Sequence, residues 1–380
     1  MNSLELLSEF ETFLQKKKDT GKKIIAFLGH DNIPIELLEA ADFFPLRMIF
    51  AGDDQLMNSS NTYLPPSTCS FAQSCIGYFT LTPRTHKFLE YVDYFLLSNH
   101  CVSDICVSEI ISDVADLKRL DFYVPYYRNE NASKYYKIEL TNLKNEIEKL
   151  TRERIPDYKI RDSIIKQNDF KKVVKDISNL KIKGYEKLKL YQKAMLFGPN
   201  VQPELERIVE KHRDHNEINL KEYKNLLLTG CSIFIDDFLI DLIDESGGNI
   251  VHFDTWIGHQ YYSQIFSQET LEKIQDPYKL LIKRFETNVY GDHCISHSLE
   301  NQINSIINYI NQFKKENPNM EDVAVLNHII KFCDHFSLFQ STFKQKLQEK
   351  GVKVLNLERD YSRAMRGQLR TRIEAFMEMI

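Results

Sequence analysis

The sequence lacks the short motifs by which many nucleotide-binding and hydrolytic enzymes are recognised. It contains no Gly-x-Gly-x-x-Gly or Walker A loop, no His-Glu-x-x-His or Gly-x-Ser-x-Gly motif, and no paired Cys-x-x-Cys. These motifs mark phosphate-binding loops, zinc hydrolases, serine hydrolases and zinc fingers, respectively. Any chemistry must therefore come from residues that lie far apart in the sequence.

Long apolar runs and a strong charge imbalance are also missing. No run approaches the ~20 apolar residues that a membrane helix needs. The segment Met1–Phe10 is acidic and amphipathic, without the basic and apolar regions of a signal peptide. The composition is 43% hydrophobic and 27% charged, as in soluble globular proteins, and the net charge of −5 argues against general nucleic-acid binding. We expect a cytoplasmic protein that binds neither membrane nor nucleic acid.

Length and pattern predict two similar halves. The chain has 380 residues, enough for two domains with a cleft between them. In the first half, apolar strand candidates alternate with helical segments, which is typical of an open parallel sheet. The predicted strands are residues 22–29, 45–50, 92–98 and 121–125, and helices are expected near 34–43, 71–80 and 105–119.

The pattern changes to long charged helices after residue 130 and returns to strand-helix alternation after residue 220. The later strands are predicted at 225–230, 249–254, 322–329 and 352–360, with helices at 233–245 and 363–380. We expect an α/β fold of two doubly wound, flavodoxin- or Rossmann-like parallel-sheet domains, at 1–130 and 221–380. A helical connector at 131–220 joins them.

Seven cysteines are present, and structural disulfides are rare in a reducing cytoplasm. Cys101 and Cys333 each lie just past a predicted strand, and Cys69 opens a predicted helix. In an open α/β sheet these positions meet at one crevice, so the three thiols could converge. Nearby helix N-termini would lower their pKa values, which favours metal binding. Because the three have no local spacing signature, position alone leaves a packing role open.

We expect structural roles for the other four cysteines. Cys75 and Cys106 fall inside predicted helices, Cys231 follows a strand-terminal glycine, and Cys294 lies beside His293 and His297. We interpret each as a packing residue or as a support for other side chains.

Several segments, in order along most of the chain, resemble the 2-hydroxyacyl-CoA dehydratase and benzoyl-CoA reductase family. They are residues 34–41, 69–78, 123–130, 331–334, 358–360 and 367–379. The length resembles the smaller, beta-type subunit of these heterodimers.

The resemblance implies a [4Fe-4S] cluster in the cleft between the domains, bound by Cys69, Cys101 and Cys333, with one iron left for a non-protein ligand. Two of the family's ligands are usually followed by aspartate. Cys333 agrees with this pattern, whereas Cys101 is followed by Val102, and Asp104 is the nearest substitute.

The resemblance also implies a lyase subunit. Such enzymes remove water from an (R)-2-hydroxyacyl-CoA to give a 2-enoyl-CoA through a ketyl radical, after an ATP-dependent activator supplies one electron. The expected partners are this activator, an acyl-CoA substrate and a homologous second subunit, or a second copy of the chain in a homodimer. In a beta-type subunit the cluster would relay electrons.

Three alternatives remain open at this stage. The chain could be a subunit of a benzoyl-CoA-type ring reductase or of another redox enzyme of the family. It could be an electron carrier or scaffold without turnover, or a member that has lost its cluster. Catalytic acid–base residues are unassigned. His100 is interpreted as structural, and Arg370 and Arg372 as helix-surface ion pairs.

Overall fold

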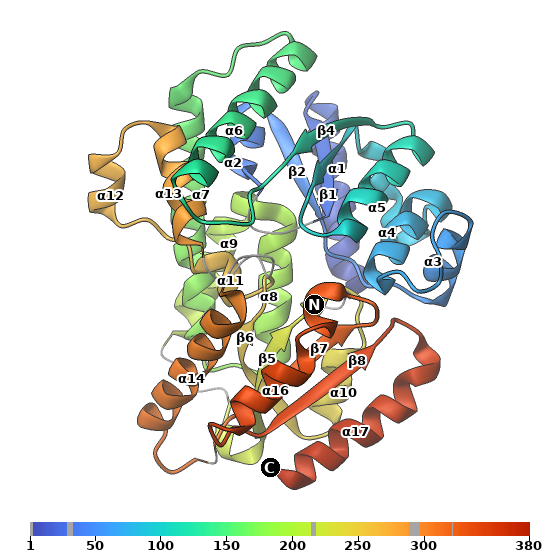
Figure 1. Cartoon of the computed structure of the whole chain (residues 1–380), viewed down its shortest axis with the longest axis vertical. Coiled ribbons are helices and arrows are strands. Elements are labelled where there is room, and N and C mark those ends of the chain that lie inside the picture. The colour runs from blue at the N-terminus through green and yellow to red at the C-terminus, as the bar shows by residue number, and fades with distance from the viewer. Residues whose placement is uncertain (1–2, 29–32, 214–217, 289–296, 321) are drawn as a thin grey trace.

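The fold is built on two four-stranded parallel sheets (Figure 1). It comes from a computed structural model that describes residues 3–28, 33–213, 218–288, 297–320 and 322–380. The strand order is β2-β1-β3-β4 in the first sheet and β6-β5-β7-β8 in the second. The second half therefore repeats the topology of the first, and the predicted class of two doubly wound α/β units is confirmed.

The central strands are buried because helices cover both faces of each sheet. In β7, for example, all seven residues are buried. The first sheet contains β1 (Lys23–Leu28), β2 (Phe43–Met48), β3 (Tyr94–Ser98) and β4 (Lys118–Phe122). The second contains β5 (Lys224–Gly230), β6 (Gly248–Asp254), β7 (Ala324–Ile330) and β8 (Val354–Arg359).

The helices of the first half include the predicted crossovers. They are α1 (Ser3–Asp19), α2 (Ile35–Ala40), α3 (Asp54–Ser59), α4 (Ser70–Leu81) and α5 (Val102–Val114). The 3-10 helices of the described chain are η1 (Ser60–Thr62), η2 (Arg84–Tyr91), η3 (Gly198–Val201), η4 (Leu220–Glu222) and η5 (Arg363–Met365).

The charged middle segment is helical, as predicted. It forms α6 (Glu130–Thr151), α7 (Asp157–Ser178), α8 (Gly184–Phe197) and α9 (Gln202–His212). Leu140 and Leu143 of α6 join the apolar cluster on one face of the first sheet, whereas Ala194 of α8 joins a cluster that includes residues of both sheets. The connector helices thus cover both sheets. The domain limits at 130 and 220 stay a prediction.

The second half carries the remaining helices. They are α10 (Leu239–Glu245), α11 (His259–Tyr262), α12 (Gln268–Lys273), α13 (Pro277–Thr287), α14 (Ser298–Glu316), α15 (Asp334–Ser337), α16 (Gln340–Gln348) and α17 (Arg366–Met379). The prediction that a helix begins at Ile233 is wrong, because Ile235 pairs with Phe50 in an isolated parallel bridge. Within the described ranges, no helix is both long and apolar enough to cross a bilayer.

Backbone hydrogen bonds join the two halves. The Ala51 amide donates to the Ile235 carbonyl at 2.9 Å, and the Ile235 amide donates to the Ile49 carbonyl at 2.9 Å. A further bond runs from the Ser70 amide to the Lys331 carbonyl at 3.2 Å. Together with the shared apolar cluster, these bonds hold the carboxyl ends of the two sheets against each other.

Candidate metal centre

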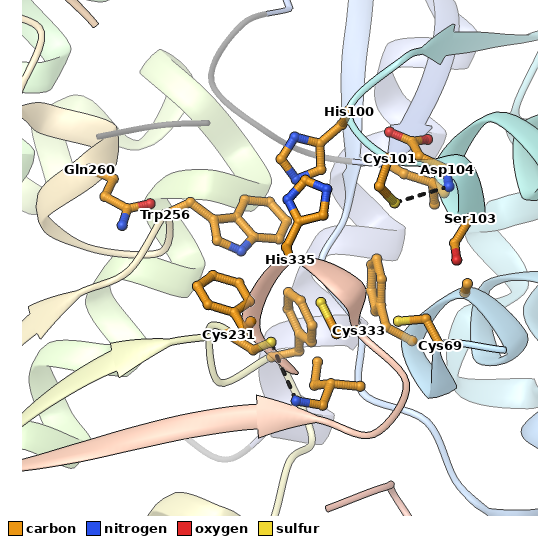
Figure 2. Close-up of a pocket in the computed structure, with 16 residues that line it drawn as sticks. Cys69, His100, Cys101, Ser103, Asp104, Cys231, Trp256, Gln260, Cys333 and His335 are labelled. Carbon is orange, nitrogen blue, oxygen red and sulfur yellow. Dashed lines mark hydrogen bonds between the residues drawn. The ribbon is translucent and has the colours of Figure 1, made fainter. Parts of the chain in front are cut away.

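A cavity of about 100 Å³ lies where the carboxyl ends of the two sheets meet (Figure 2). Leu28 at the end of β1 and Ile330 at the end of β7 line it from opposite sides. Most of the other lining side chains are aromatic residues, histidines and cysteines. The cysteines of the lining are Cys69, Cys101, Cys231 and Cys333.

Two of these thiols come from the first half and sit at helix N-termini. Cys69 precedes α4, and the nearby backbone amides of Phe71 and Ala72 act to lower the pKa of its thiol. Cys101 precedes α5 in an extended conformation, and its sulfur accepts a hydrogen bond from the Asp104 amide at 3.3 Å. Both sulfurs therefore face backbone dipoles that favour negative charge.

The third predicted thiol reaches the same cavity from the second half. Cys333 lies three residues beyond β7, after Phe332, whose φ of 63° turns the chain in the left-handed region. The Cys333 amide donates to the Ile330 carbonyl at 2.9 Å. The Cys333 thiol is close enough to the Cys69 thiol to act on its pKa. The structure thus brings Cys69, Cys101 and Cys333 to one cavity, as the strand-end positions predict.

The expected lowering of the thiol pKa values is wrong for the metal-free chain. The contact with Cys333, followed by burial, raises the pKa of Cys69 well above its usual range despite the helix amides. Burial, with Asp104 as the second cause, raises the pKa of Cys101. Packing the thiols together out of water thus opposes their ionisation more than the amides favour it. A bound cation reverses this balance, because its charge stabilises thiolates directly.

Asp104 is the carboxyl group of the cavity. It lines the cavity and is buried, accepting a hydrogen bond from the Ser108 hydroxyl at 3.1 Å, and burial raises its pKa well above the usual range. By contrast, Asp334, which follows Cys333 as in the family pattern, is exposed and does not line the cavity. The carboxylate expected next to a ligand is therefore found at Asp104.

Histidines and aromatic rings complete the walls. The His100 ring packs on that of His335 with centroids 4.6 Å apart, and burial lowers the pKa of His100 to about 4. Trp256, the single tryptophan of the chain, lines the cavity beside Phe234. His100 is therefore held neutral in a mostly apolar environment.

Cys231 is the lining residue that sequence reasoning missed as a candidate ligand. It is buried and was interpreted as a packing residue. Figure 2 shows its sulfur on the Cys333 side of the cavity. The available signal was its position directly after β5, because β5 and β7 are neighbours in the sheet and Cys333 follows β7.

The remaining predictions have mixed outcomes. Neither Cys75, buried in α4, nor Cys106, exposed on α5, lines the cavity, while His293 and Cys294 lie outside the described residues. Arg370 forms the predicted ion pair, with Glu245. Arg372 instead donates to the Asn356 carbonyl at 2.8 Å.

A second group of metal-binding residue types lies away from this cavity. Ligand atoms of His252, Asp254 and His259 are within 4.8 Å of one another. His259 lies 3.7 Å from the Asp254 carboxylate, which also accepts a hydrogen bond from Thr229 at 3.0 Å. These contacts are those of a carboxylate paired with a histidine, so they do not require a bound metal.

Comparison with known proteins identifies the family of the chain. Residues 32–380 match the family model described as 2-hydroxyglutaryl-CoA dehydratase, D-component. The chain belongs to this family. The resemblance noted from the sequence segments is thereby confirmed.

Two relatives of this dehydratase family illustrate its range. The chain is 23% identical to the (R)-phenyllactyl-CoA dehydratase beta subunit of Clostridium sporogenes over the full length of both proteins. It is 22% identical to one of the subunits of the benzoyl-CoA reductase of Thauera aromatica, with 72% of this chain and 77% of the relative aligned.

Proposed function

We propose that this chain is the iron–sulfur subunit of a 2-hydroxyacyl-CoA dehydratase, a lyase that removes water from an (R)-2-hydroxyacyl-CoA to give a 2-enoyl-CoA. The family match and the full-length similarity to a dehydratase beta subunit support this assignment. The observation on which it mainly rests is that Cys69, Cys101 and Cys333, from distant segments, line one cavity.

The proposed cofactor is a [4Fe-4S] cluster ligated by Cys69, Cys101 and Cys333. Thiolate donors and amides aimed at two of the sulfurs fit such a cluster. When bound, the cluster would relay the single electron that makes the thioester a ketyl radical anion at the partner's centre. Hydroxide would then leave, the C3 proton would become acidic and be lost, and the electron would be returned as the 2-enoyl-CoA forms. The cavity walls contribute by excluding water, which would otherwise quench one-electron chemistry. Acid–base residues remain unassigned in this chain.

The proposal includes a homologous second subunit and an ATP-dependent activator. The (R)-phenyllactyl-CoA relative is named as a beta subunit, which supports a multi-subunit enzyme. In this assembly the beta-type chain relays the activator's electron, and the acyl-CoA binds at the partner's centre.

Iron analysis tests the cofactor assignment. Anaerobically purified chain should contain about four iron and four sulfide per polypeptide, and Cys69→Ala, Cys101→Ala and Cys333→Ala should each lose most of both. Cys106→Ala, at an exposed position on α5, is the matched control and should retain them. Near-stoichiometric iron in one of the three variants would remove that residue from the ligand set. A wild-type chain without iron would contradict the proposal.

Product analysis separates the dehydratase from its rivals. With partner subunit and reduced activator, (R)-2-hydroxyacyl-CoA should yield 2-enoyl-CoA. The similarity to a benzoyl-CoA reductase makes a ring reductase the second candidate. Ring reduction of an aryl-CoA without dehydration would support that candidate instead. Cluster reduction without turnover of either substrate would support an electron carrier.

A further inference from the structure

We propose that Cys231 is a fourth protein ligand of the metal centre, so that a cluster bound here is held by four thiolates and has no iron open to substrate. This inference rests on the proposed function and sharpens it. It replaces the expectation from family resemblance that one iron is left for a non-protein ligand.

Cys231 lies at the carboxyl end of a central strand of the second sheet. Cys231 follows β5 and Cys333 follows β7 within three residues, and these two strands are neighbours in the order β6-β5-β7-β8. After β5 the chain crosses to β6, and after β7 it crosses to β8. The two connections therefore run in opposite directions from the middle of the sheet. The crevice between the two carboxyl ends is where doubly wound sheets bind ligands. Cys231 and Cys333 stand on its two sides.

The Cys231 sulfur has a backbone hydrogen bond of its own. The Cys231 sulfur accepts a hydrogen bond from the Ile330 amide at 3.3 Å, matching the bond from the Asp104 amide to Cys101 (Figure 2). The Cys231 side chain is also the leading cause that raises the pKa of the Cys333 thiol. Amide donors stabilise a thiolate and are typical of the surroundings of cluster sulfurs. Cys231 therefore shares the environment of the other proposed ligands.

The backbone fixes the direction of the Cys231 side chain. Gly230 has φ of 86°, and a Cβ there would lie 2.3 Å from the His328 carbonyl oxygen, so the turn before Cys231 requires glycine. The Cys231 amide donates to that same carbonyl at 2.8 Å.

The His328 side chain also holds the Cys231 backbone, through the Cys231 carbonyl. Arg359 Nε lies 3.2 Å from His328 Nε2. Because arginine has only donors, Nε2 must accept, and the His328 proton is on Nδ1. Nδ1 then donates to the Cys231 carbonyl at 2.8 Å. Both polar groups of the Cys231 backbone are thus bonded to His328, as expected of a ligand that must be held in place.

The alternative is that Cys231 only fills space. Cys75 provides the comparison, because it is also buried and lies in α4 next to Cys69, but does not line the cavity. A space-filling cysteine needs neither an amide donor to its sulfur nor a thiol partner. Cys231 has both, and Cys75 is therefore the matched control for it.

A cluster held by four thiolates transfers electrons without binding substrate. It takes up one electron from the reduced activator and passes one electron on, so its composition does not change. Four protein ligands would thus assign this chain to electron relay and leave the acyl-CoA to the partner's centre.

Oxidation of the anaerobically purified chain tests the fourth ligand. A [4Fe-4S]2+ cluster with one iron lacking a cysteine ligand gives up an electron to ferricyanide and releases Fe2+, leaving [3Fe-4S]+, which is counted by electron paramagnetic resonance. Cys231→Ala should form several-fold more of this species than the wild type. Cys75→Ala should match the wild type. Equal and extensive formation in the wild type and Cys231→Ala would overturn the proposal.

If Cys231→Ala loses the cluster altogether, a second variant still tests the proposal. Cys231→Ser offers an oxygen ligand, so it should change the resonance spectrum of the reduced cluster and lower its reduction potential relative to Cys75→Ser. An unchanged spectrum and potential would overturn the role of Cys231 while leaving the proposed function intact. Absence of a cluster from the wild type would instead remove the proposed function itself.

Discussion

Arg359 is the largest fully buried side chain of the described chain. It forms an ion pair with Asp237, whose side chain is also inaccessible to solvent, and donates to His328. The Asp237 carboxylate in turn accepts a hydrogen bond from the Leu239 amide at 2.9 Å. This network links the end of β8 and the start of α10 to the backbone of Cys231. A residue remote from the cavity therefore supports one of its thiols.

We expect Arg359→Met to destabilise the protein by about 3–5 kcal/mol, because it leaves a buried carboxylate without its cation. The loss should appear as a lower midpoint of urea unfolding, followed by the fluorescence of Trp256. In the double variant with Asp237→Asn the loss should be smaller than the sum of the two single losses. A change below about 1 kcal/mol in Arg359→Met would mean that the pair contributes little.

At the scale of elements, α4 is packed unusually closely against α3. A Cβ built on Gly77 of α4 would lie 2.3 Å from the Leu56 carbonyl oxygen of α3. Because this neighbour is backbone, it cannot rotate away. The same helix begins at Cys69, so the close packing also fixes the amides that face this sulfur.

Gly77→Ala should therefore destabilise the protein by roughly 1–3 kcal/mol. In an open helix position the same change is stabilising by up to about 1 kcal/mol, because alanine is the better helix former. Gly367 in α17 provides the control, since nothing lies within 4 Å of a Cβ there. Thermal unfolding of the two variants should shift in opposite directions. Equal upward shifts would rule out the close approach at Gly77.

Most elements could be predicted from apolar periodicity, and the misses have physical causes. β4 begins at Lys118 and not at Asp121, because it is an edge strand whose first residues are charged and exposed. β2 is also an edge strand and tolerates Pro45 in its interior, so it begins before the proline. In both cases an edge position relaxed the composition that identifies buried strands.

The site was predictable in part. Strand-end positions and family resemblance pointed to Cys69, Cys101 and Cys333. Cys231 was missed because what distinguishes it from a packing residue comes from Ile330 and His328, about a hundred positions away. A hydrogen bond between such distant segments leaves no local pattern in the sequence.

At the scale of the whole molecule, each half buries a histidine that cannot easily accept a proton. His86, in η2, packs its ring against Phe50 and Tyr78 with centroids 4.9 and 4.5 Å apart. Burial lowers its pKa to about 3. Burial likewise lowers the pKa of His252, in β6, to about 3. The folded protein keeps both rings neutral at pH values where the unfolded chain protonates them.

Stability should therefore fall on mild acidification. Between the unfolded pKa of 6.5 and the folded pKa of about 3, the unfolded chain binds more protons, so the stabilisation is complete above 6.5 and is lost as the pH decreases. Each histidine should account for about 2 kcal/mol of loss at pH 5. Urea midpoints at pH 7.5, 6 and 5 measure this, and His86→Phe should flatten the dependence. A slope in His86→Phe equal to that of the wild type would contradict the assignment.

The backbone bonds between the halves have a consequence for the order in which the protein matures. Ser70 and Lys331 are hydrogen-bonded to each other, and each is adjacent or nearly adjacent to one of the proposed ligands. Ribosomal synthesis exposes Cys69 and Cys101 long before Cys231 and Cys333 emerge. A cluster that needs thiols from both halves can be completed only when the second sheet docks, and the bonds at Ile235 and Lys331 then close around it. If the proposed cluster binds here, its completion therefore depends on docking of the two sheets, and iron supply and chain folding would limit the same event.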